Sequence, residues 1–172
     1  MKSKKTKNLT IFSSSVGLGS LLFLVIGLMN IDNYINWIQF SVTMYVAGIL
    51  FGILLYRTIC YFVPAAKTYK NTQGIKLNFL LMFSAANIFF GAGTIVNEFS
   101  SKEKTCKLYT IESMGESGSR NAYYVFIKND GKRERLSFGK EFNKIHIPGE
   151  AINLCIITGR LGFKYYKVKG RN

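Results

Sequence analysis

The sequence has few of the residues from which catalytic and metal sites are usually built. It contains a single histidine, His146, and 9 acidic residues against 23 lysines and arginines. One imidazole with scattered carboxylates does not form a ligand set of the usual spacing. The chain also lacks a Gly-x-Ser-x-Gly turn, a Gly-x-x-x-x-Gly-Lys loop and a Cys-x-x-Cys pair. We therefore expect no enzyme activity, no bound metal and no cofactor.

Charge is also nearly absent from three long stretches of the first hundred residues. The runs at 9–31, 37–63 and 77–96 contain one formal charge in total, Arg57. A bilayer core about 30 Å thick is crossed by roughly 20 apolar residues in a helix, which satisfies its own backbone hydrogen bonds. Buried helices of a soluble protein would instead carry charge on the opposite face. The sequence predicts a domain of three transmembrane helices over residues 1–97.

The distribution of lysine and arginine predicts how these helices are oriented. No Lys or Arg lies in the loop Asn30–Asn36, whereas the N-terminus and the second loop are basic. By the positive-inside rule, both basic segments are cytoplasmic and residues 98–172 lie outside the inner (cytoplasmic) membrane. The lysines that follow the third run, Lys102, Lys104 and Lys107, argue against this orientation.

Small and polar residues recur at helical spacing along each apolar run. Such faces let helix backbones approach closely, and a buried amide in lipid needs a partner on another helix or in a wet cavity. The candidate packing residues are Gly17, Ser20, Gly48, Gly52, Ser84, Asn87 and Gly91. They are consistent with packing inside one bundle, with contacts to a second copy or a larger membrane complex, or with a polar path for an ion or solute.

The remaining residues, 98–172, change to short alternating segments separated by turn residues. Asn129-Asp130-Gly131 predicts a hairpin, since Asp-Gly accommodates positive φ. Strands are predicted at 106–112, 122–128, 132–138, 151–158 and 163–169, with a loop at 113–121 and a helical turn at 139–145. This order fits a small all-β domain, either an OB-like or SH3-like barrel or an open meander.

Two of the three cysteines, Cys106 and Cys155, fall on predicted strands of this domain, whereas Cys60 lies near the cytoplasmic end of the second run. An oxidising exterior would permit a disulfide between Cys106 and Cys155 if their strands are adjacent. The bridge would close a loop of about fifty residues and stabilise a modest core.

The net charge of +14 is shared equally between residues 1–97 and residues 98–172. A basic domain at a membrane favours anionic lipid head groups or acidic partners, although a solvated basic surface explains the same composition. The basic hairpin residues Lys132, Arg133 and Arg135 are the candidate contact surface. A nucleic-acid partner is not expected outside the cytoplasm.

Two resemblances accompany these features. The runs 123–127, 131–135, 148–150 and 159–163 resemble the C-terminal β module of small bacterial multi-span membrane proteins, a family that implies no activity. Three spans with Lys76-Leu77-Asn78 opening the last one are similar to membrane immunity proteins against pore-forming colicins. The expected function is non-enzymatic partner binding in an envelope complex. Immunity or superinfection exclusion, against a pore-forming toxin or a phage, and a small channel or transporter subunit are the alternatives.

Overall fold

The computed structural model describes residues 4–71, 74–99, 103–117, 122–129, 131–138 and 140–168. The chain forms two compact units. The helical unit consists of Met1–Met29 and Ile38–Ile95, and the β unit consists of Asn30–Trp37 and Val96–Asn172. The β unit thus includes the loop between the first two helices, a segment that the sequence-based boundary placed with the helices.

Three long helices, α1 (Lys4–Asn30), α2 (Trp37–Phe62) and α3 (Leu77–Phe99), are each long and apolar enough to cross a membrane. This part of the predicted layout is confirmed. Two short 3-10 helices, η1 (Ile31–Asn33) and η2 (Pro64–Thr68), follow α1 and α2. Many large apolar side chains of α1 and α2 are exposed, among them Leu18, Leu22 and Leu54.

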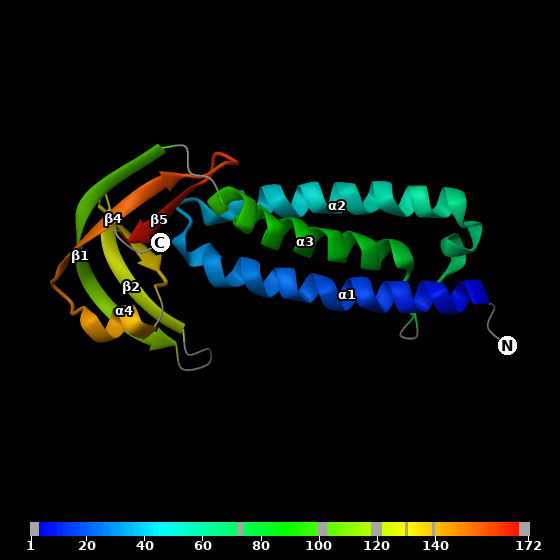
Figure 1. Cartoon of the computed structure of the whole chain (residues 1–172), viewed down its shortest axis with the longest axis horizontal. Coiled ribbons are helices and arrows are strands. Elements are labelled where there is room, and N and C mark those ends of the chain that lie inside the picture. The colour runs from blue at the N-terminus through cyan, green and yellow to red at the C-terminus, as the bar shows by residue number, and fades with distance from the viewer. Residues whose placement is uncertain are drawn as a thin grey trace. The chain divides into compact units, whose positions relative to one another are not determined.

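Helix α3 packs against both other helices of the helical unit (Figure 1). A Cβ added to Gly48 of α2 would lie 2.5 Å from the Cα of Ala86, and one added to Gly52 would lie 2.6 Å from the Cα of Met82. A Cβ on Gly91 of α3 would overlap the backbone of Phe23 in α1. Gly48, Gly52 and Gly91 therefore lie where backbones approach closely inside the bundle, whereas the atom nearest to a Cβ on Gly17 is a side-chain carbon of Leu80 at 4.0 Å.

The β unit contains one five-stranded antiparallel sheet in the order β3-β2-β1-β4-β5. Its strands are β1 (Glu103–Ser117), β2 (Ala122–Asn129), β3 (Lys132–Leu136), β4 (Ala151–Thr158) and β5 (Lys164–Val168). The first half of β1 pairs with β4, and the residues from Ile111 onward pair with β2, with an irregularity between Ile111 and Ser113. The sheet curls around β1 into a half-barrel with β3 and β5 as its edges (Figure 1).

Strand β1 differs from the prediction in its length. It continues to Ser117, so residues 113–117 of the predicted loop form β structure, and residues 118–121 lie outside the described part. The glycine-rich composition suggested a loop, but Gly115 lies directly opposite Tyr124 in β2. The pairing with β2 supplies hydrogen bonds that intrinsic propensity does not, so strand preference is decided by context here.

The core of the β unit lies on the concave face of the half-barrel. Side chains that alternate along the strands meet there with Phe142 of the short helix α4 (Lys140–Ile145). The buried members are Tyr109, Ile111, Val125, Ile127, Leu136, Phe142, Ile152, Leu154 and Tyr166. The hairpin between β2 and β3 turns at Gly131, whose φ of 79° agrees with the expected turn, while Asp130 lies outside the described residues.

Candidate interaction surface

The outward face of the β2–β3 hairpin carries two arginines stacked on aromatic rings. Because Val125 and Ile127 point into the core, Tyr124 and Phe126 point outward. The guanidinium carbon of Arg133 lies 3.9 Å from the centroid of Phe126, and that of Arg135 lies 4.7 Å from the centroid of Tyr124. Cation–π contacts of this kind hold a long side chain in one orientation.

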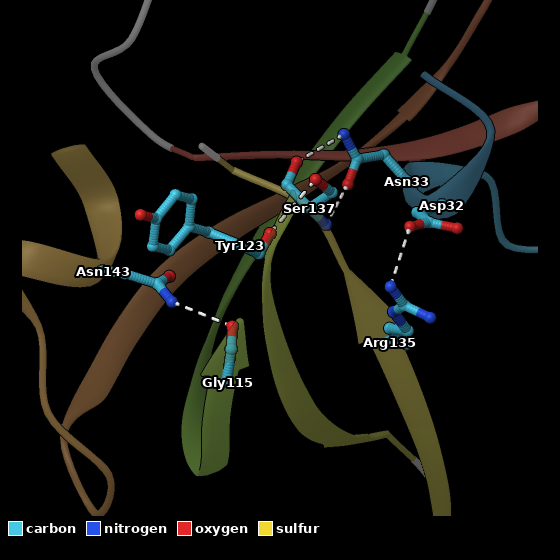
Figure 2. A network of polar contacts seen from close by, with 7 residues as sticks. All are labelled: Asp32, Asn33, Gly115, Tyr123, Arg135, Ser137 and Asn143. Carbon is cyan, nitrogen blue, oxygen red and sulfur yellow. Dashed lines mark hydrogen bonds and ion pairs between the residues drawn. The ribbon is translucent and has the colours of Figure 1, made fainter. Parts of the chain in front are cut away.

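Gly115 makes room for one of these rings. Gly115 pairs with Tyr124 of the neighbouring strand β2, and a Cβ at Gly115 would overlap the Tyr124 ring. The carbonyl of Gly115 also accepts a hydrogen bond of 3.3 Å from Nδ2 of Asn143 in α4 (Figure 2). Gly115 thus positions Tyr124, and Tyr124 in turn supports Arg135.

Each stacked arginine also faces a carboxylate. Nε of Arg133 lies 3.5 Å from Glu112, and its Nη2 donates a 2.7 Å hydrogen bond to Ser113. Nη2 of Arg135 lies 3.8 Å from Asp32 (Figure 2). The arginine side chains remain 56% and 46% exposed, so these pairs contribute little stability. Their effect is to orient two cations while leaving both accessible.

The loop between α1 and α2 binds one edge of the sheet through Asn33. Nδ2 of Asn33 donates to the carbonyl of Ser137 at 3.0 Å, and the amide of Ser137 donates to Oδ1 of Asn33 at 2.9 Å (Figure 2). The hydroxyl of Ser137 donates to the carbonyl of Tyr123 at 3.2 Å. The loop is therefore joined to the chain immediately after β3.

The same loop reaches the opposite edge of the sheet. The amide of Ile35 donates to the carbonyl of Lys164 at 3.0 Å, and the ring of Tyr34 stacks on Tyr165 at 5.9 Å. Burial raises the pKa of the Tyr34 hydroxyl above its ordinary value. The loop at 31–35 therefore bridges β3 and β5, the two edge strands of the half-barrel.

Asn97, in the last turn of α3, joins the end of that helix to the turn between β4 and β5. It is fully buried, and its Nδ2 donates to the carbonyl of Phe163 at 3.0 Å. Its Oδ1 accepts from the amide of Leu161 at 3.1 Å, and its backbone carbonyl accepts from Arg160 at 3.0 Å. A Cβ on Gly159 would overlap Asn97, so glycine is needed at this close approach.

The two cysteines of the sheet form a disulfide. Cys106 of β1 lies directly opposite Cys155 of β4, and the structure joins their sulfur atoms across a sequence separation of 49. Cys155 is fully buried, and Cys60 is a buried free thiol in the helical unit. The bridge links β4 to β1, the strand that pairs with β4 in one half of the sheet and with β2 in the other.

Polar packing residues of the helical unit fall into two groups. Ser20 donates a 2.8 Å hydrogen bond to the carbonyl of Gly17. Ser84 and Asn87 are each 1% exposed, and no hydrogen-bond partner for Ser84 Oγ or the Asn87 amide exists among the described residues.

Within the described residues, no group of three His, Cys, Asp or Glu side chains is placed to hold a metal ion. His146 instead contacts Glu150 through Nδ1 at 2.9 Å and stacks on Phe142 with ring centroids 4.2 Å apart. The hydrogen bond from His146, together with one from the amide of Ile147, lowers the pKa of the Glu150 carboxyl.

The structure places two of the three predicted surface residues together and one apart, and it adds residues that the sequence analysis did not name. Arg133 and Arg135 lie side by side on the outward face, whereas Lys132 lies at the hairpin end opposite Asn129. Tyr124 and Phe126 alternate with Val125 and Ile127 along the predicted strand 122–128, and this alternation is the signal that the sequence carries for them. Asp32 and Asn33 carried none, since they are over a hundred positions from Arg135 and Ser137.

Comparisons with protein-family models, curated proteins and solved structures found no match.

Proposed function

We propose that this chain is a multi-pass protein of the bacterial inner (cytoplasmic) membrane whose extracytoplasmic β unit binds an acidic protein partner in an envelope complex, without catalysis. The observation that carries the proposal is the pair of arginines, Arg133 and Arg135, held over aromatic rings on an accessible face. Guanidinium groups of fixed orientation suit bidentate recognition of carboxylates.

The length and composition of α1, α2 and α3 support membrane insertion. The exposed apolar side chains of α1 and α2 support it further, because so many would be unfavourable in water. In a bilayer the same side chains contact lipid tails.

Two features support an extracytoplasmic β unit. The Cys106–Cys155 disulfide is typical of oxidising compartments, since cytosolic thiols are kept reduced. The loop 30–37 belongs to the same compact unit as the sheet and contains no Lys or Arg. Short loops decide orientation, whereas larger domains cross the membrane largely regardless of charge, so Lys104 and Lys107 carry less weight.

Cysteine labelling tests the compartment. An impermeant maleimide added to intact cells should label the exposed Cys106 only after reduction, and Cys60 should stay unlabelled. Labelling of the sheet cysteines only after lysis would place the β unit in the cytoplasm and contradict the proposal.

Site-specific photo-crosslinking tests partner binding. A crosslinking residue at Lys132 should give a discrete adduct in membranes, whereas the same residue at Lys104 in β1 should not. For the charge test the crosslinking residue is moved to Lys128, because position 132 is itself substituted. Combining Lys132→Glu with Arg133→Gln should then lower the adduct yield about tenfold, since charged contacts are lost from the interface.

The matched control combines Lys104→Glu with Lys107→Gln, which removes the same charge from exposed positions of β1. Arg135 is left unchanged because a carboxylate there would face Asp32. Equal adduct yields from both double variants, with the disulfide intact in each, would refute binding at the hairpin.

A further inference from the structure

A second basic surface of the β unit lies where the chain enters and leaves the proposed membrane spans. We infer that this surface, formed by Arg160 and Lys164 beside Trp37 and Phe99, binds the phosphate groups of anionic lipids in the adjacent leaflet. We call these four residues the rim. The inference rests on the membrane insertion proposed above and is independent of partner binding at the hairpin.

The first step places the backbone of the rim near the helix ends. The carbonyl of Lys164 is 3.0 Å from the amide of Ile35, two residues before α2 begins. The amide of Arg160 is 3.0 Å from the carbonyl of Asn97, two residues before α3 ends. One hydrogen bond therefore joins the start of β5 to the loop just before α2, and a second joins the turn between β4 and β5 to the last turn of α3.

The second step concerns depth. Helices of 26 and 23 residues are at least as long as the hydrocarbon core is thick, so their ends reach the head-group layer. That layer extends about 5–7 Å beyond the core on each side. A Lys or Arg side chain spans a similar distance, so side chains anchored next to the helix ends reach the phosphate groups.

Exposed aromatic residues mark the same level. Trp37 opens α2 with 53% of its surface exposed, and Phe99 closes α3 with 83% exposed. Amphipathic rings such as Trp are enriched where lipid tails meet head groups. Leu161, at the tip of the turn between Arg160 and Lys164, is 42% exposed and adds an apolar contact.

The charges around the rim favour an anion. Arg160 and Lys164 are both exposed, and Lys167 lies further along β5. Lys104 adds a basic group on β1, opposite Ile157 of β4. The acidic groups on the neighbouring segments are Glu98 at the end of α3, Glu103 at the start of β1, opposite Thr158, and Asp32, which faces Arg135. The basic groups exceed the acidic ones, so a lipid with net negative charge is favoured over a zwitterionic one.

The single tryptophan of the chain, Trp37, makes the inference directly measurable. The full-length protein is reconstituted in vesicles of phosphatidylcholine and phosphatidylglycerol, with one lipid at a time brominated on its acyl chains. Brominated lipids quench tryptophan on contact, so quenching by each lipid reports its occupancy beside the rim. Brominated phosphatidylglycerol should quench at a several-fold lower mole fraction than brominated phosphatidylcholine.

The variant that combines Arg160→Gln with Lys164→Gln should lose this several-fold preference, because the two basic groups supply it and each contributes a factor of up to about five near an anionic surface. The control combines Lys128→Gln with Lys132→Gln on the hairpin and should keep the preference.

Three outcomes would overturn the inference: no preference in the unmodified protein, a preference that survives the rim substitutions, or an equal loss in both double variants. Absence of quenching by either lipid would instead refute membrane insertion. Unreactive sheet cysteines in every variant would show that the β unit is folded.

Discussion

The helical unit and the β unit use polar residues in different ways. In the helical unit, backbones approach at Gly48 and Gly91, and the buried Ser84 and Asn87 have no partner within the described residues. In the β unit, the buried Asn97 uses both its amide oxygen and its amide nitrogen. Side-chain amides therefore join distant segments in the β unit, whereas in the bundle glycines set how closely α3 approaches α1 and α2.

The largest expected effect follows from removing the disulfide. This change should destabilise the β unit and leave the stability of the helical unit unchanged. Combining Cys106→Ser with Cys155→Ser should destabilise the β unit by about 4 kcal/mol, because a closed loop of this length restricts the unfolded chain. Amide hydrogen exchange of the full-length protein should become faster in the strands and stay unchanged in α2. Cys60→Ala is the control and should leave the strands protected, whereas equal acceleration in both units would contradict their separation.

A smaller effect is expected from adding one methyl group to the helical unit. Gly48→Ala should destabilise the packing of α2 on α3 by about 1–3 kcal/mol, since its Cβ would meet the backbone of Ala85 and Ala86. The control is Gly19→Ala in α1, where nothing lies within 4 Å of the added atom. Detergent-induced unfolding measures both, and similar losses for the two variants would show that the helices do not approach at Gly48.

Replacing two buried serines of the helical unit by alanine should change the stability of the bundle differently. Ser84→Ala removes a hydroxyl without a described partner and should stabilise the bundle by about 1 kcal/mol. Ser20→Ala removes a hydroxyl that donates to Gly17, so it should be neutral or destabilising. The same detergent titration distinguishes them. Destabilisation by Ser84→Ala would mean that its hydroxyl has a partner, such as a water bridging it to Asn87.

The smallest effect concerns pH and the β unit. The folded-state pKa of Glu150 is lowered, so its ionised form stabilises the fold above the ordinary carboxyl pKa, and this contribution disappears as the pH falls through the lowered value. On acidification, the unmodified protein should therefore lose more stability than Glu150→Gln. Urea unfolding at several acidic pH values measures the difference, and parallel curves would remove any role for the contact with His146.

Local patterns predicted much of the β unit but not how its edges are joined. Alternation and turn residues located β2, β3, β4 and β5 to within a few residues, because strand faces repeat with period two. The residues 113–117 were misassigned because glycine and serine favour loops unless a neighbouring strand pairs with them. The sequence placed Arg133 and Arg135 on the hairpin, but their stacking on Phe126 and Tyr124 depends on the register of β2 and β3.

The sequence by itself determined which segments form helices and strands, and that the helices are apolar and the sheet is basic. Long uncharged runs make three membrane-length helices, and an alternating basic tail makes a small sheet, since both follow from periodicity and burial along a continuous segment. Only the tertiary structure decided that the loop 31–35 bridges β3 and β5, and that Asn97 binds the turn between β4 and β5. Such contacts join residues more than sixty positions apart, and no local pattern in a single chain records which of many polar side chains will meet.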